Sequence, residues 1–170
     1  MDIGQELKLH KSITNNSDVS LNNLHRHGTY AGLYLSAHSQ QDIFKIIIGC
    51  GIPRSKELGD LHCTVLYSKA PYPDALWYEA DLNLLDATPI GYEAWTGHDG
   101  KRYLVMRLES ALLESMHEVF LAGGATHSFD EFKPHVTITN EWDDRMPVSS
   151  IPVPNEPITF SRFEVSPLEE

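Results

Sequence analysis

The feature that most constrains the fold is an internal match, in which the chain of 170 residues aligns with itself after a shift of 73 positions. Apolar positions then fall on apolar positions, and the identical pairs include Tyr30 with Tyr103, Gly51 with Gly124, His62 with His135 and Thr64 with Thr137. Each half runs strand, helix, strand. The match therefore predicts an internal duplication with a pseudo-two-fold axis that brings equivalent strands together.

Hydrophobic periodicity predicts the elements of each half. The expected helices cover 39–51 and 110–124, and the expected strands cover 29–36, 61–68, 77–85, 88–97, 102–110, 134–140 and 158–165. In the first helix, Ser39 and Asp42 could form a capping box, and Gly51 could end the helix. The second helix is expected to turn four apolar side chains inward: Leu112, Leu113, Met116 and Phe120.

The predicted organisation is an N-terminal arm followed by one domain. Residues 1–27 are polar and form the expected arm, and residues 28–170 form the expected bilobal domain. The predicted fold class is α+β, with two pseudo-symmetric antiparallel sheets, each backed by helix, around a central cleft. Residues 141–157 contain four prolines and are expected to form a long loop or extended segment.

A His-x-Thr motif lies on the last strand of each half. Successive side chains on a strand point to opposite faces, so His62 and Thr64 share one face and Cys63 lies on the other. His135 and Thr137 share a face in the same way. One such motif is common on exposed strands and says little, but two copies at equivalent positions of a repeat indicate a shared site.

Two imidazoles and two hydroxyls in one cleft suit phosphodiester chemistry. A neutral histidine can accept a proton from an attacking hydroxyl, and a protonated one can donate to the leaving oxygen, because the ordinary pKa of histidine is about 6.5. Threonine hydroxyls can hold the non-bridging oxygens. The residues alone do not decide which histidine is base and which is acid. No cofactor is expected, and no metal is required.

The segments LHCTVLYS (61–68) and FKPHVTITN (132–140) resemble the two signatures of the 2H phosphoesterases. The resemblance covers most of 28–166 and implies a bilobal, metal-independent phosphoesterase with His62, Thr64, His135 and Thr137 as site residues. Together with GTY at 28–30, the chain is most similar to the phage anti-CBASS phosphodiesterases. That similarity implies cleavage of 3′-5′ linkages in cyclic di- and trinucleotides such as cGAMP, through attack by the adjacent ribose 2′-hydroxyl.

Four further residues are candidates for substrate contacts. By resemblance, Tyr30 could stack on a base or touch the phosphate, and Glu164 could accept a hydrogen bond from a base edge. Trp95 is a candidate base platform, and Lys133 could attract phosphate. Each has a plainer interpretation as a rim tyrosine, an exposed glutamate, a packing tryptophan or a surface lysine.

Composition limits the partners. The formal net charge of -11 opposes binding of long nucleic acids and of anionic membranes. Two cysteines do not suggest a disulfide framework, so a reducing compartment is expected. The resemblance implies the cytoplasm of a host bacterium.

Two other functions remain open. A phosphoesterase acting on RNA or tRNA ends would favour a basic surface, whereas this chain has more acidic than basic residues. A binding protein that sequesters cyclic nucleotides without cleaving them is disfavoured by intact His-x-Thr motifs in both halves. The sequence does not fix the oligomeric state.

Overall fold

The computed structural model describes residues 21–55, 58–128 and 131–168. Most of the expected N-terminal arm lies outside these residues, and its last part forms the short helix α2 (Leu21–Arg26). The division into an arm and one domain stays a prediction.

The first half contains β1 (Thr29–Leu35), α3 (Ala37–Cys50) and β2 (His62–Ser68). Helix α3 begins after Ser36, whose side chain accepts the N–H of Ser39. The expected cap at Ser39 is therefore wrong; this residue is buried inside the helix. Its hydroxyl accepts the N–H of Thr159 at 2.9 Å and so fixes α3 to the last strand.

Gly51 ends α3 as expected. Its φ of 66° lies in the left-handed region, and its N–H bonds back to the last turn of the helix.

The second half contains β3 (Asp86–Thr96), β4 (Arg102–Glu109), α4 (Ala111–Ala122) and β5 (His135–Thr139). Ser110 caps α4 by accepting the N–H of Leu113. Of the four side chains expected to point inward, Leu112 does not: it is 47% exposed, whereas the other three are buried.

The chain between the halves corrects a second prediction. Residues 77–85 were expected to form a strand, but the 3-10 helix η2 (Pro73–Trp77) is followed by a turn. Asp81 organises this turn: its carbonyl accepts the N–H of Leu84, and its carboxylate accepts the N–H of Asn83. These local bonds satisfy backbone groups that a strand would have paired with a neighbour. The proline-rich stretch contains only the short η3 (Val148–Ser150) before β6 (Ile158–Pro167).

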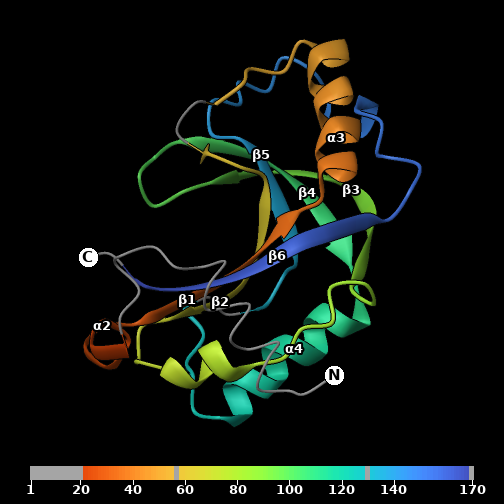
Figure 1. The fold of residues 1–170 in the computed structure, drawn as a ribbon. Helices are drawn as coiled ribbons and strands as arrows, with labels where there is room; N and C mark the ends of the chain where they lie inside the picture. Colours follow the sequence, from red (N-terminus) through yellow and green to blue (C-terminus); the bar gives the residue numbers. More distant parts are fainter. Residues whose placement is uncertain (1–20, 56–57, 129–130, 169–170) are drawn as a thin grey trace.

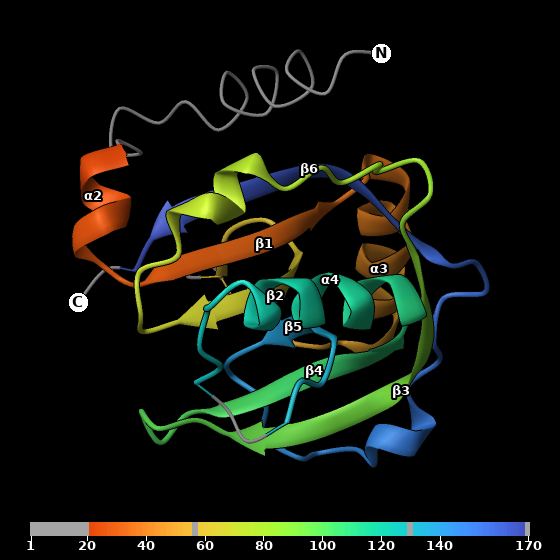
Figure 2. The ribbon, with the colours of Figure 1, turned by 90° about the horizontal axis from the view of Figure 1, so that it is seen from below.

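The six strands form one closed antiparallel ring in the order β1-β2-β5-β4-β3-β6 (Figure 1). The two predicted sheets are its halves, β6-β1-β2 and β5-β4-β3, and the α+β prediction is confirmed. The halves meet through one pair between β2 and β5 and two pairs between β3 and β6. Because α3 packs against β6 and α4 against β2, the helices cover the ring from opposite sides (Figures 1 and 2).

Equivalent strands share their register across the halves. In the first half Gly32 pairs with Thr64, Leu33 with Cys63 and Tyr34 with His62. In the second half the equivalent pairs are Val105 with Thr137, Met106 with Val136 and Arg107 with His135. Both β1 and β4 carry a bulge just before the first of these pairs. A bulge re-aims neighbouring side chains, so its repetition supports the predicted duplication.

The pseudo-two-fold axis passes between β2 and β5. Cys63 pairs with Val136, which is its own equivalent in the repeat, as an axis between antiparallel strands requires. Both side chains are fully buried and belong to one hydrophobic core that both halves share. The motif residues on either side of this pair therefore face away from the core.

Candidate active site

Each motif histidine is held by a backbone bond two residues earlier in the chain. The Nδ1 of His62 lies 2.8 Å from the carbonyl oxygen of Asp60, and the Nδ1 of His135 lies 2.7 Å from that of Lys133. Because a carbonyl oxygen can only accept, both Nδ1 atoms carry the proton and donate. In each neutral ring this fixes Nε2 as the atom that can accept a proton.

The structure brings the two motifs together on neighbouring strands. With Cys63 opposite Val136, the half-buried His62, Thr64, His135 and Thr137 all lie on the face opposite the core. Cys63 is fully buried, and burial raises the pKa of its thiol to about 12. The thiol therefore stays protonated and turned away from the site, as the alternation of the strand predicts.

Tyr30 reaches into the first motif. Its hydroxyl oxygen lies 3.1 Å from Thr64 Oγ1, and its ring meets that of His62 edge-on with centroids 6.3 Å apart. Burial raises the pKa of Tyr30 above its ordinary value, so the phenol keeps its proton. Gly32 makes this position possible, because a Cβ there would come within 2.5 Å of the Tyr30 hydroxyl.

The equivalent tyrosine of the second half makes a different hydrogen bond. Val105 occupies the position of Gly32, and Tyr103 donates its hydroxyl to Asp99 at 2.7 Å instead. Thus one glycine distinguishes the surroundings of the two threonines.

The outer side of His62 is formed by β1 and β6. The Tyr34 ring lies 5.2 Å from the His62 ring, and the Arg162 guanidinium stacks on Tyr34 at 4.1 Å. Arg162 donates from Nε to Glu164 at 2.8 Å and lies 3.7 Å from the Asp60 carboxylate. Glu164 therefore lies beside the site and is paired with an arginine, and its contact with a base edge stays a prediction.

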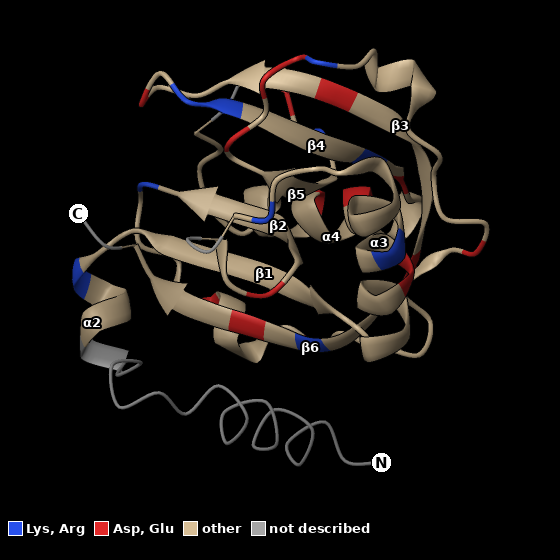
Figure 3. Ribbon diagram, turned by 90° about the horizontal axis from the view of Figure 1, so that it is seen from above, with Lys and Arg blue, Asp and Glu red and all other residues tan. Residues whose placement is uncertain are grey.

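The outer side of His135 is formed by β3 and β4. The Trp95 ring packs against His135 with centroids 4.5 Å apart, and its indole contributes a hydrogen bond to Glu93. Arg107 also donates to Glu93, and this bond is the main cause that holds the pKa of the Glu93 carboxyl below its ordinary value. In Figure 3 an acidic segment marks the middle of β3 and of β6, where these two Arg–Glu pairs lie in opposite halves.

Burial is the main cause that lowers the pKa of His135 below its ordinary value. The positive charges of Arg107 and of His62 act in the same direction, while the bond to the Lys133 carbonyl and the Glu93 carboxylate act against it. The neutral form of His135 is therefore favoured near neutral pH.

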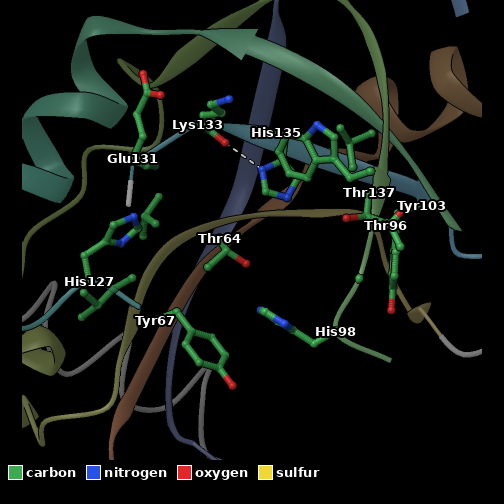
Figure 4. A pocket seen from close by; sticks show the side chains of 16 residues that line it. Thr64, Tyr67, Thr96, His98, Tyr103, His127, Glu131, Lys133, His135 and Thr137 are labelled. Atoms are coloured by element: carbon green, nitrogen blue, oxygen red, sulfur yellow. Dashed lines mark hydrogen bonds between the residues drawn. The ribbon is translucent and has the colours of Figure 1, made fainter. Parts of the chain in front are cut away.

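A cavity of about 520 Å³ opens beside His135. Thr64, His135 and Thr137 line it together with the predicted contact residues Trp95 and Lys133. Figure 4 shows the labelled side chains around this common space, with the bond from His135 to the Lys133 carbonyl dashed. Its other walls come from aromatic and imidazole side chains on three segments: Tyr67, His98, Tyr103, His127 and Phe132.

The structure thus places all eight candidate residues around one region and adds others that the sequence did not indicate. Tyr34 and Arg107 are the most informative additions, because they occupy equivalent positions directly opposite the two histidines. The repeat carried this signal, since the two numbers also differ by 73. His98 and His127 had no pattern that could have been recognised.

The structure places two further buried residues and one exposed cluster outside the cavity beside His135. Trp142 is buried in the core, and His117 is buried with its Nδ1 bonded to the Val65 carbonyl. His38, Asp42 and Glu156 form an exposed cluster at the start of α3 whose ligand atoms lie within 4.8 Å of one another. Among the described residues, no helix has the length and apolar character needed to cross a bilayer.

Comparison with known proteins identifies relatives over most of this domain. Residues 27–170 match the family described as "Anti-CBASS protein Acb1". The protein of that name from Vibrio phage KVP40 is 27% identical over 125 residues, covering 71% of this chain and 76% of that protein. Its counterpart from Acinetobacter phage Ac42 is 34% identical over 120 residues, covering 65% and 71%.

A phage T4 counterpart is 34% identical over 89 residues, covering 52% of this chain and 53% of that protein. Among solved structures, the crystal structure of E. coli LigT complexed with 3′-AMP matches with a TM-score of 0.48 and 17% identity, covering 84% of this chain and 95% of that one. Because the family match spans residues 27–170, the chain belongs to the anti-CBASS protein Acb1 family, as the resemblance predicts.

Proposed function

We propose that the chain is a phosphodiesterase that opens the 3′-5′ linkages of cyclic di- and trinucleotides and thereby depletes the signal of CBASS defence. One observation carries this proposal: two histidines with fixed Nδ1–H tautomers lie on neighbouring strands, related by a pseudo-two-fold axis at Cys63 and Val136. Two such imidazoles can act on one phosphorus from opposite sides.

The proposed reaction is an internal transfer. One imidazole takes the proton of a ribose 2′-hydroxyl through Nε2, and the 2′-oxygen attacks the adjacent phosphorus. The bond from phosphorus to the 5′-oxygen breaks, and the second imidazole gives that oxygen a proton. The product is a linear nucleotide with a 2′,3′-cyclic phosphate, which water can then hydrolyse with the two imidazoles in exchanged roles.

In this scheme the threonine hydroxyls donate hydrogen bonds to the non-bridging oxygens of the phosphate. When Tyr30 donates its hydroxyl to Thr64, the proton of Thr64 is available for a phosphate oxygen. Thr137 offers its hydroxyl from the other strand. Donors of this kind stabilise the charge that develops on the oxygens in the transition state.

The cavity beside His135 suits one nucleoside of the ring. Its volume of about 520 Å³ lies within the range of small-molecule sites, roughly 300–1,000 Å³. Trp95 provides an aromatic face and Lys133 a positive charge at this wall, while Tyr30 and Glu164 border the opposite side of the histidine pair. Aromatic faces accept any base, so the proposal covers rings of mixed composition.

The proposal is tested by incubating the protein with a panel of cyclic di- and trinucleotides and separating the products by chromatography with mass spectrometry. Linear products from at least one ring are expected. Recovery of unaltered ligand after long incubation, together with tight binding, would instead support a sequestering protein. Cleavage restricted to 2′-5′ linkages or RNA-terminal 2′,3′-cyclic phosphates would support the RNA-end alternative.

Activity is expected to survive EDTA, because the proposed chemistry uses only imidazole and hydroxyl groups. The exposed cluster of His38, Asp42 and Glu156 provides a control, since it is the group of possible metal ligands that the described residues bring together. The variant His38→Ala should cleave at the rate of the unaltered protein with or without EDTA. Loss of activity in EDTA that zinc or manganese restores would contradict this expectation.

A further inference from the structure

The two halves differ at the strand position directly opposite each histidine. Arg107 pairs with His135, and Tyr34 occupies the equivalent position opposite His62. Side chains at directly opposed positions of neighbouring strands lie on one face and interact. A site that is symmetric in its histidines and threonines is therefore asymmetric in charge.

Arg107 brings a positive charge next to His135, and this charge is paired with the single carboxylate of Glu93. The guanidinium engages Glu93 through Nη1, whereas its buried Nε has no hydrogen-bond acceptor among the described residues. The groups that face His135 from neighbouring elements are Arg107 on β4, Glu93 and Trp95 on β3, and His62 on β2. Lys133 lies two residues earlier, before β5 begins, and adds another cation to the cavity wall.

The charges around His62 have the opposite balance, with more negative than positive groups. Its ring contacts two tyrosines, Tyr30 and Tyr34. The nearest arginine on that side, Arg162, is bonded to Glu164 and lies 3.7 Å from the Asp60 carboxylate. One positive charge thus faces two negative charges in the surroundings of His62.

We propose that Arg107 is a positioning residue that selects His135 as the general base of ring opening and leaves His62 as the general acid. This inference rests on the proposed function. His135 takes the proton of the 2′-hydroxyl, and His62 gives its proton to the departing 5′-oxygen. In the hydrolysis that follows, His62, now neutral, takes a proton from water, and His135, now protonated, gives one to the departing ribose oxygen.

The assignment also orients the substrate. The cavity lies on the side of His135 and Trp95, so it receives the nucleoside whose 2′-hydroxyl attacks. The nucleoside that departs through its 5′-oxygen lies toward His62, Tyr34 and Arg162.

A purely structural Arg107 would only tie β4 to β3 through Glu93. Two substitutions that change the charge next to His135 in opposite directions distinguish this alternative from the proposed role. In Arg107→Gln the charge that disfavours imidazolium is lost, so the pKa of His135 should rise and the acid limb of the kcat/KM profile should move to higher pH. In Glu93→Gln a charge that favours imidazolium is lost, and the limb should move to lower pH. Arg107→Lys keeps the charge and should leave the limb nearly unchanged.

The same variants allow a readout that does not depend on turnover. Titration of the His135 ring by NMR should show the three shifts in the same order and directions. If Arg107→Gln and Glu93→Gln moved the titration in one direction, or if neither moved it in a folded protein, Arg107 would not act on His135 as proposed.

The roles of the histidines are tested with a cyclic dinucleotide that carries sulfur in place of the bridging 5′-oxygens. A thiolate leaves without a proton, so a variant that lacks the general acid should regain its rate on this ring. His62→Ala should approach the rate of the unaltered protein on the sulfur ring, while His135→Ala should stay about 10²–10⁴-fold slower. Rescue of His135→Ala instead would reverse the roles while the proposed function stands. If the unaltered protein opened neither ring, the proposed function itself would fail.

Discussion

Alanine at His62 or at His135 is expected to lower kcat for ring opening by about 10²–10⁴-fold each, the usual contribution of a positioned acid or base. Each ring is half-buried, and each is bonded to one backbone carbonyl through Nδ1, so its removal leaves the core pair of Cys63 and Val136 intact. The variants should therefore fold. Rates measured under single-turnover conditions would isolate the chemical step from product release.

The double variant sharpens this prediction. In the proposed reaction both imidazoles act in one transition state, so the double substitution should lower kcat little more than the worse single one. The variant His25→Ala is a matched control, since His25 is exposed on α2. It should retain full activity. Substantial turnover by a folded His62→Ala or His135→Ala protein would defeat the assignment of the pair.

Removal of the 2′-hydroxyls of the ring should have an equally large effect. A cyclic dinucleotide that lacks both hydroxyls has no internal nucleophile, so it should bind with little change in affinity and remain uncleaved. The affinity should be preserved because, in the proposed binding mode, Trp95 and Lys133 of the cavity wall contact the base and the phosphate and do not need the 2′-hydroxyl. Binding can be measured by calorimetry and cleavage by chromatography.

A ring that lacks only one 2′-hydroxyl provides the control for this experiment. It should open only at the linkage next to the remaining hydroxyl, which sequencing of the linear product by mass spectrometry can show. Ready opening of the ring that lacks both hydroxyls would mean that water attacks the phosphorus directly.

Much of the fold could be predicted because the repeat and the alternation of side chains along strands are both visible in the sequence. The match of His62 with His135 by itself indicated which strands would meet, and the observed pair of Cys63 with Val136 lies at the centre of that match. The inward Cys63 followed from strand alternation alone. The Gly51 cap followed from the freedom of glycine to adopt positive φ.

The remaining features depended on contacts that no local pattern contains. Residues 77–85 alternate like a strand, but the local turn at Asp81 takes up their backbone bonds. The cavity needed the β3–β4 hairpin and the segment after α4 to close around His135.

The charge asymmetry between the halves does not follow from the identities in the repeat. The identities mark residues that both halves share, such as the histidines and threonines. The positions that differ, Tyr34 against Arg107 and Gly32 against Val105, are the ones that break the symmetry of the site.

The most direct test of the account is a rapid-quench reaction of the ring in water labelled with ¹⁸O. Internal transfer adds no atom, so the first product should have the mass of the intact ring, carry no label and separate from it by chromatography. One labelled oxygen should enter only when this isomer is hydrolysed. A linear product that carries ¹⁸O from the earliest time, with no isomer before it, would contradict attack by the 2′-hydroxyl between His62 and His135.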